Sequence, residues 1–240
     1  MRKRDLMWIR SGNSGGGRDT LCDLIENGLE NGVLYCETAE SVKENVFEGS
    51  TKIKKVVLPN VKVVNRYAFS ECLYIDEVNL PSVEFIDKQA FFGCGDSIKE
   101  LIVKIPNVKK IEANAFAQCY KLKKISLPNI EETIGLAFDN CNNLEKVIIG
   151  NASARLGAYS FYCPALSAIV LTDEENFITD AAAFLYAFGP DGKNPLLNGT
   201  CFIYVPSNMY SIYEEMCVAN GASDLLAMFR KIEDYPEICE

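Results

Sequence analysis

Residues 67–94 read YAFSECLYIDEVNLPSVEFIDKQAFFGC, and this stretch begins and ends on the same pattern. The motif Ala-Phe-x-x-Cys at residues 68–72 recurs at residues 90–94, with Leu-Pro at residues 80–81 between the two copies. The interval is 22 residues. A fixed interval of about 20–50 residues is typical of repeat proteins. The stretch therefore predicts a solenoid in which each repeat forms one coil.

The same anchor residues continue along the chain in both directions. Their Phe residues lie 22 to 25 residues apart, and most are followed three residues later by Cys. The predicted Phe ladder consists of Phe47, Phe69, Phe91, Phe116, Phe138, Phe161 and Phe184. The predicted Cys ladder consists of Cys72, Cys94, Cys119 and Cys141, with Cys163 displaced by one position. Because one repeat cannot bury its apolar face alone, these side chains are expected to stack coil on coil.

A short run of alternating apolar and polar residues lies between the anchors, as in Ile75, Val78 and Leu80. Each run predicts a short strand that pairs in parallel with the next, about 4.8 Å away. In several copies Pro follows the strand directly, where its missing N–H ends the ladder. The extra residues of the third copy, within residues 95–106, are expected to form a bulge in a loop.

The pattern AFxxCxxLxxIxLPxVxxI, repeated over residues 42–184, resembles the BspA-type leucine-rich repeat. The resemblance implies a β-rich α/β leucine-rich-repeat solenoid, with a parallel sheet on the concave face and irregular or 3₁₀ segments on the convex side. The sequences DLIENGLENG at residues 23–32, CFIYVPSNMYSIYEEM at residues 201–216 and IEDYPE at residues 232–237 resemble the ends of repeat proteins encoded by phages and prophages. That likeness implies a tail-associated or host-interaction role.

The chain is expected to form one domain with four parts. These are a flexible N-terminal segment at 1–20, an N-terminal cap at 21–46, the solenoid at 47–205 and a helical C-terminal cap at 206–240. Within the C-terminal cap, residues 207–220 and 222–232 are predicted as two helices, because Ser207 and Ser223 are suitable N-cap residues. Such a cover would prevent solenoids from stacking end to end.

Composition excludes several classes of function. The 240 residues include 33 acidic and 24 basic side chains, and a net charge of −9 disfavours binding to nucleic acid or anionic lipid. The apolar run Leu6–Ile9 is too short for a signal peptide or a membrane span, so the chain is expected to be cytoplasmic as synthesised, with incorporation in a phage particle implied by the resemblance. The ten Cys are therefore expected to be reduced thiols.

The sequence offers no convincing catalytic, cofactor-binding or metal site. His is absent, which removes Ser-His and Cys-His nucleophiles. A ladder of Cys runs in a line and does not converge on a metal, and no CxxC pair occurs. The glycine-rich residues 12–19 lack the Lys and Ser or Thr of a phosphate-binding loop. Acidic pairs at 131–132 and 173–175 are expected to be solvated surface, so the chain is not expected to be an enzyme.

The alternation of the strands also predicts which side chains face outward. They form two columns on the concave face. The first contains Lys55, Glu77, Glu100, Lys124, Lys146 and Ala168, and the second contains Val57, Asn79, Ile102, Ser126, Ile148 and Val170. The first column places Lys55 beside Glu77 and Glu100 beside Lys124, and such pairs support a sheet by about 0.2–1 kcal/mol each. The aliphatic side chains of the second column favour a binding surface unless the N-terminal segment covers them.

These observations predict a non-enzymatic module that binds a protein or a glycan through its concave face, without a cofactor. The first alternative is a structural virion or assembly component whose ends make the contacts. The second alternative is a bacterial surface adhesin, although such proteins carry export signals. The sequence names neither the ligand nor the oligomeric state.

Overall fold

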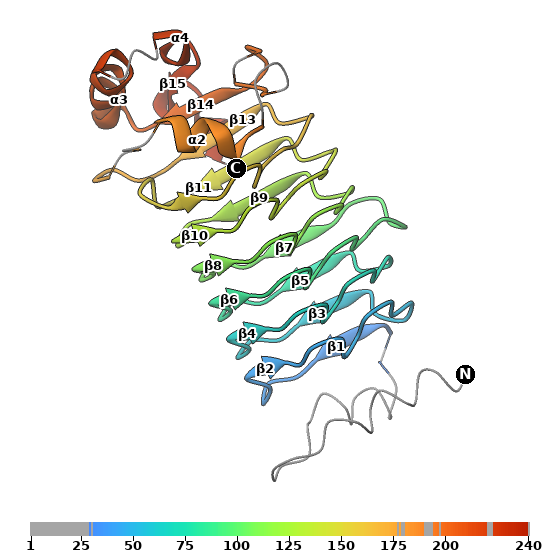
Figure 1. Ribbon diagram of the computed structural model, residues 1–240. Helices are drawn as coiled ribbons and strands as arrows, with labels where there is room; N and C mark the ends of the chain where they lie inside the picture. Colours follow the sequence, from blue (N-terminus) through green and yellow to red (C-terminus); the bar gives the residue numbers. More distant parts are fainter. Residues whose placement is uncertain are drawn as a thin grey trace.

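The structure is a computed structural model, which describes residue 29 and residues 31–176, 178, 181–189, 194–196, 198–219 and 223–239. The chain winds as a stack of coils, with helices gathered at the C-terminal end (Figure 1). Most coils contribute two short strands, one to each of two sides of the stack. The predicted β-rich solenoid with parallel strands is confirmed. The predicted flexible segment 1–20 and most of the N-terminal half of the predicted cap lie outside the described residues.

The first strand of each coil pairs in parallel with the first strand of its neighbour. The N-terminal sheet consists of β1 (Val33–Tyr35), β3 (Lys55–Val57), β5 (Glu77–Asn79) and β7 (Ile102–Lys104). The C-terminal sheet consists of β9 (Lys124–Leu127), β11 (Lys146–Ile149), β13 (Ala168–Leu171), β14 (Phe202–Val205) and β15 (Phe229–Lys231). Val56, Val78 and Ile125 point inward from these strands and are fully buried. The predicted alternation therefore separates core from surface.

The second strand of each coil belongs to a parallel side sheet, which the sequence did not reveal. It consists of β2 (Ser41–Val42), β4 (Val63–Val64), β6 (Phe85–Ile86), β8 (Lys110–Ile111), β10 (Glu132–Thr133) and β12 (Arg155–Leu156). Val64, Ile86 and Ile111 point inward and are fully buried. The expectation of irregular or 3₁₀ structure is wrong for this part of the coil. The sequence could not indicate these strands, because two residues are too few to show an alternating pattern.

The insertion in the third repeat shifts the register of β7. Glu77 lies opposite Ile102, and Asn79 lies opposite Lys104. Alternation with the apolar run Ile98, Leu101 and Val103 places Glu100 in the first column and Ile102 in the second, and both placements are wrong. Glu100 instead lies exposed in the segment just before β7. The extra residues are therefore taken up before the strand, and the strand begins two residues later than expected.

The insertion also divides the ladder of first strands. β7 is the last strand of the N-terminal sheet, and β9 is the first strand of the C-terminal sheet. An isolated parallel bridge between Leu101 and Leu122 joins the two, with the Leu101 N–H donating to the Lys121 carbonyl at 3.0 Å. The core continues across this junction, because Leu101 and Leu122 are both buried.

The Phe rings stack along the centre of the solenoid. Successive ring centroids lie 5.0–5.2 Å apart for Phe47, Phe69, Phe91, Phe116, Phe138 and Phe161. The next ring in the stack is Phe188, whose centroid lies 5.5 Å from that of Phe161. Phe184 packs against Phe188 at a tilt of 55°, so its predicted place in the ladder is wrong. The helix α2 (Ala181–Ala187) replaces the usual turn of this coil and delivers the later Phe.

The Cys side chains form a second column beside the rings. In each coil the Cys Sγ donates to the carbonyl oxygen of the Phe in the preceding coil, at 3.0–3.2 Å, in the pairs Cys72–Phe47, Cys94–Phe69, Cys119–Phe91, Cys141–Phe116 and Cys163–Phe138. A thiol is small and apolar enough for the core, yet it can satisfy a buried carbonyl. Burial raises the pKa of Cys72 to about 12, so this thiol stays protonated.

Each coil turns after its side-sheet strand through a residue with a left-handed backbone. These residues have φ of 55–66° and are Asn45, Tyr67, Gln89, Asn114, Leu136 and Tyr159. The next residue in several coils is a buried Ala, and the following Phe N–H donates to the Ala carbonyl of the next coil, as from Phe69 to Ala90 at 2.8 Å. Ala-Phe therefore recurs because adjacent backbones meet at the Ala and the Phe fills the core.

Both ends differ from the predicted caps. At the N-terminal end, β1 and β2 pair with β3 and β4, so residues 33–42 form the first described coil and not a cap. At the C-terminal end, the helices are α3 (Ser207–Ala219) and α4 (Ser223–Leu226). The prediction of one helix over residues 222–232 is wrong beyond Leu226, because β15 pairs in parallel with β14. The 3₁₀ turns η1 (Ile232–Asp234) and η2 (Pro236–Cys239) follow.

Candidate functional site

The outward side chains of the N-terminal sheet form two rows across its strands. One row contains Val33, Lys55, Glu77 and Ile102, and the other contains Tyr35, Val57, Asn79 and Lys104. Because successive side chains of a strand point to opposite faces, both rows face away from the buried core. We call the following residues the open face: Tyr35, Lys55, Val57, Glu77, Asn79, Ile102 and Lys104.

A group of three charged side chains occupies the centre of the open face. The Glu77 carboxylate lies 2.8 Å from Lys104 Nζ and 3.2 Å from Lys55 Nζ. The predicted pair of Lys55 and Glu77 is therefore present, whereas Ile102 takes the place expected for Glu100 and Lys104 takes the place expected for Ile102. Hydrogen bonds from Lys104 and then Lys55 lower the pKa of Glu77 below its ordinary value. The carboxylate stays ionised at neutral pH, and the group holds its two lysine side chains in place.

Apolar side chains flank this charged group. Tyr35 and Ile102 are each 47% exposed, and Val57 between them is half-buried. Exposed large apolar residues beside charged ones are the usual composition of a surface that binds a partner. Sequence reasoning missed Tyr35, which it assigned to the cap, and Lys104, which the insertion concealed. The motif Ile-Pro-Asn at residues 105–107 matches Leu-Pro-Asn at residues 58–60 and would have given the correct register.

The remaining predicted site residues lie on the C-terminal sheet. Lys124 and Ser126 are half-buried on β9. Ile148 is 8% exposed and Val170 is 0% exposed, so the expectation that both face solvent is wrong.

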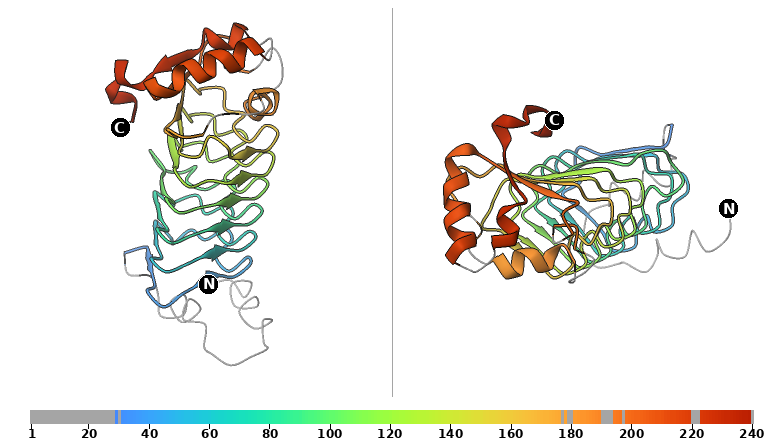
Figure 2. Two further views of the ribbon diagram at one scale, coloured as in Figure 1. Left: turned by 90° about the vertical axis from the view of Figure 1, so that its left-hand side faces the viewer. Right: turned by 90° about the horizontal axis from the view of Figure 1, so that it is seen from above.

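The chain's own C-terminal segment lies against this part of the sheet. η2 packs against β13, and the Lys146 Nζ donates to the Ile238 carbonyl oxygen at 3.0 Å. The Tyr235 ring meets the Tyr204 ring edge-on at 5.4 Å. The end of the chain lies beside the C-terminal coils (Figure 2). The sequence suggested the N-terminal segment as a cover, whereas the structure places the C-terminal segment there.

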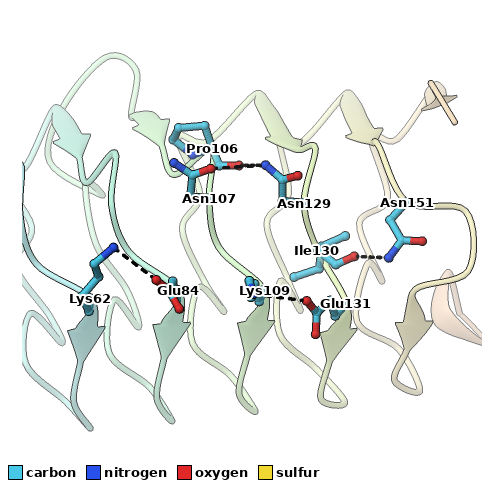
Figure 3. A network of polar contacts seen from close by, with 9 residues as sticks. All are labelled: Lys62, Glu84, Pro106, Asn107, Lys109, Asn129, Ile130, Glu131 and Asn151. Carbon is cyan, nitrogen blue, oxygen red and sulfur yellow. Dashed lines mark hydrogen bonds and ion pairs between the residues drawn. The ribbon is translucent and has the colours of Figure 1, made fainter.

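A second surface feature lies where each first strand ends and the chain turns toward the side sheet. This corner groove has a volume of about 620 Å³. Its lining consists of Lys62, Ser82, Glu84, Asn107, Lys109, Pro128, Asn129, Glu131, Gly150, Asn151, Asp173 and Asn176. Figure 3 shows two rows of these side chains, with amides along one side and alternating lysines and glutamates along the other.

The acidic pairs that the sequence raised as acid–base candidates are held in ion pairs or turns. Glu131 lies 3.7 Å from Lys109, and Glu132 lies 3.1 Å from Lys110 and 3.0 Å from Arg155. Within the part of the chain that the structure describes, no cluster of three His, Cys, Asp or Glu side chains is arranged to hold a metal ion. Nor do the described residues include a helix long and apolar enough to span a membrane.

Comparison with solved structures finds similar chains among bacterial proteins. A leucine rich cell surface protein from Faecalibacterium prausnitzii A2-165 is 24% identical, with 58% of this chain and 36% of that chain covered and a TM-score of 0.45. A leucine rich repeat protein from T. pallidum is 21% identical, with 61% and 83% covered and a TM-score of 0.45. The pneumococcal vaccine antigen PcpA is 19% identical, with 76% and 39% covered and a TM-score of 0.45. The match therefore spans about a third of the F. prausnitzii protein. A search of curated proteins finds no significant match.

The repeats themselves match a family model. The BspA type leucine rich repeat region matches residues 40–164 and residues 86–186, with six copies. These overlapping ranges span more than half of the chain and coincide with the coils that carry the Phe and Cys columns. Solenoids of this kind are typical of binding and surface modules, because stacked coils present an extended surface. The chain belongs to the family of the BspA type leucine rich repeat region.

Proposed function

We propose that the protein recognises a protein or glycan non-covalently through the open face, and that it catalyses no reaction. In keeping with the resemblance of its ends to phage and prophage repeat proteins, the proposed setting is a phage tail or another host-interaction assembly. The observation that supports recognition is the exposure of Tyr35 and Ile102, at 47% each, around the charged group at Glu77.

The chemistry of the open face favours a protein over a glycan. Each exposed apolar side chain gains about 25 cal/mol per Å² when a partner removes it from water. Aromatic and aliphatic anchors ringed by polar groups are the usual centre of a protein interface. The two lysines and one glutamate carry a net positive charge, and they complement an acidic group at the centre of the partner's surface.

The test replaces one exposed aliphatic residue on the open face and one at the C-terminal end. Ile102→Ser is compared with Val218→Ser, because Val218 on α3 is 65% exposed and is chemically similar. Binding to host-cell surfaces and to candidate tail proteins is measured for both variants after circular dichroism has verified their folds. Ile102→Ser is expected to weaken binding at least about tenfold, which corresponds to about 1.4 kcal/mol. Val218→Ser is expected to leave binding unchanged.

The alternative is a structural component whose ends make the contacts, and the exposure of Val218 on α3 is the observation in its favour. In that case the two variants exchange their effects: Val218→Ser weakens association and Ile102→Ser does not. This outcome would exclude the open face as the working surface. A role in surface adhesion is a second alternative, which the same pair of variants tests with host cells as the target.

A further inference from the structure

We infer that the corner groove is a second binding site, separate from the open face, and that it takes a linear neutral oligosaccharide. The inference begins with the geometry of the groove. One row of the groove contains the polar residue at the corner after the first strand of successive coils, and three of its members are amides: Ser82, Asn107, Asn129, Asn151 and Asp173. At about 4.8 Å per coil, this row extends roughly 19 Å. A groove of about 620 Å³ lies within the size range of ligand sites and suits an extended chain.

The amide side chains of the groove are held in fixed positions. Asn107 Nδ2 donates to the Pro81 carbonyl at 2.7 Å, and Asn129 Nδ2 donates to the Pro106 carbonyl at 2.9 Å. Asn151 Nδ2 donates in the same way to a carbonyl of the preceding coil, at 3.0 Å. Because each amide NH₂ group is anchored in this way, its oxygen is directed by the fold. Asn107 Oδ1 also accepts from Asn129 Nδ2 at 3.4 Å and Asn151 Oδ1 accepts from the Ser153 N–H at 3.0 Å, and each of these oxygens keeps a second lone pair for a ligand. A row of ordered hydrogen-bonding groups loses little side-chain entropy when a ligand binds.

The charges of the groove largely cancel. Lys62 pairs with Glu84 at 3.1 Å, and Lys109 pairs with Glu131 at 3.7 Å, in an alternating row (Figure 3). The remaining carboxylate, Asp173, accepts backbone N–H groups from Ala152, Glu175 and Asn176 at 2.9–3.1 Å. A polyanion would meet these carboxylates and a polycation would meet the ammonium groups, so neither is favoured.

The groove also offers little to an apolar ligand. Among its lining residues, Pro128 and Gly150 are the ones without a polar side chain. Hydrogen-bond acceptors and donors alternate along the groove. A ligand therefore has to donate and accept hydrogen bonds at closely spaced points. A hydroxyl group does both at once. A chain of neutral sugar rings carries such hydroxyls along its whole length, and its chemistry matches the groove.

The test uses two asparagines with the same local contact. Asn129 lines the groove, whereas Asn143, which is absent from the groove lining, donates to the Tyr120 carbonyl at 2.6 Å one coil away. Asn129→Ala and Asn143→Ala each remove one hydrogen bond to a backbone carbonyl of the preceding coil, and Asn129→Ala also removes the 3.4 Å contact with Asn107 Oδ1. Similar stabilities would show that neither variant unfolds the chain. The probes are cellohexaose, maltohexaose, mannohexaose and chitohexaose, with polygalacturonate as the acidic comparison, measured by titration calorimetry.

At least one neutral hexaose is expected to bind the natural protein. Asn129→Ala is expected to weaken this binding about tenfold or more, Asn143→Ala is expected to leave it unchanged, and polygalacturonate is expected not to compete. Absence of binding by every neutral hexaose, preference for polygalacturonate, or equal losses in the two variants would each overturn the inference. Ile102→Ser should leave oligosaccharide binding intact. The experiment therefore distinguishes a wrong inference about the corner groove from a wrong proposal about the open face.

Discussion

Phe116 shows how single residues hold the coils together. Its ring stacks between those of Phe91 and Phe138, with centroid distances of 5.0 and 5.2 Å, and its side chain is fully buried. Stacked aromatic pairs at this distance contribute about 0.5–1.5 kcal/mol beyond the burial of their surface. Each ring of the column thus stabilises two interfaces between coils, whereas an exposed ion pair such as Lys62–Glu84 contributes less, to one interface.

Phe116→Ala is expected to lower the free energy of unfolding by about 3–5 kcal/mol, because it removes two ring contacts and leaves a cavity in the core. Phe85→Ala is the matched control, since Phe85 is half-buried on the outer side of the side sheet. Its loss is expected to be about 1–2 kcal/mol. Urea denaturation followed by circular dichroism measures both values. Equal losses would contradict the assignment of Phe116 to the core.

The Cys column makes a separate prediction about reactivity. Among the described thiols, Cys239 is exposed and the others are buried. Burial raises the pKa of the Cys94 and Cys119 thiols well above the ordinary value, so the reactive thiolate is scarce. A variant with Cys22→Ser and Cys239→Ser is expected to resist an aromatic disulfide reagent until denaturant is added. Rapid labelling of the native variant would show that the column is accessible.

Sequence periodicity predicted most of the residues of both columns, because a constant spacing fixes which side chain enters the core of each coil. The sequence did not predict Phe188 as a member of the Phe column, because α2 replaces the turn of this coil. The helix places Phe188, and not Phe184, next to Phe161 in the stack. The burial of Ile148 and Val170 was also not predicted, for another reason. The segment that packs against the C-terminal sheet, η2, lies far along the chain, and no local pattern encodes such a contact.

At the scale of the element, the tight turn after each side-sheet strand carries a backbone cost. Asn tolerates the left-handed conformation, and it occupies this turn at positions 45 and 114. Tyr67, Gln89, Leu136 and Tyr159 adopt it as well, although such residues are disfavoured there by about 1–2 kcal/mol. Hydrogen bonds to the neighbouring coils, such as that from the Leu136 N–H to the Ala158 carbonyl at 3.0 Å, hold the turn in place.

Leu136→Asn is expected to raise the free energy of unfolding by about 1 kcal/mol, because Asn adopts the left-handed region at lower cost. The Leu136 side chain is 38% exposed, so little buried surface is lost. Asn114→Leu is the reciprocal change and is expected to destabilise by a similar amount. Thermal and chemical denaturation would both report the difference. If both variants shift stability in the same direction, backbone strain is not the cause.

The sequence predicted the strands in which several residues alternate between outward and buried positions, such as Lys124–Leu127. It did not predict strands of only two residues, such as Val63–Val64. Register was predictable in repeats of constant length. In the third repeat the count from Phe91 fails, while the Pro106-Asn107 turn keeps its relation to the strand. The open face was therefore predicted in part. Lys55, Val57, Glu77 and Asn79 lie where alternation put them, whereas Ile102 lies in the other row and Lys104 was not predicted.

At the scale of the whole molecule, the C-terminal segment divides the outward surface of the first strands into two regions. The N-terminal sheet keeps Ile102 exposed, whereas the outer side of the C-terminal sheet meets η2 through β13 and Lys146. The same stretch of chain stabilises the end helix, because Glu233 accepts hydrogen bonds from the Ser207 backbone at 3.1 Å and from its hydroxyl at 2.6 Å. These contacts leave the N-terminal sheet as the available face.

Deletion of residues 236–240 is expected to expose Ile148 and Val170 while keeping the bonds of Glu233 to Ser207. Binding of a hydrophobic fluorescent dye should rise, and the free energy of unfolding should fall by about 1–2 kcal/mol. The control carries Ile148→Ser and Val170→Ser in the shortened chain, and its dye binding should return to the original level. Unchanged dye fluorescence after the deletion would mean that η2 does not cover these side chains.

The interrupted ladder between β7 and β9 has a mechanical consequence. Coils of a solenoid contact their immediate neighbours, so a load applied to the two ends of the chain is carried from coil to coil in series. Strand hydrogen bonds carry that load on both sides of each coil within the two sheets of first strands. Between β7 and β9 the first strands share only the Leu101–Leu122 bridge, and the unbroken side sheet, through the pairing of β8 with β10, carries most of the load. Tension at this junction therefore falls on one side of the coil, and we expect stretching to open the stack there first along the side of the first strands.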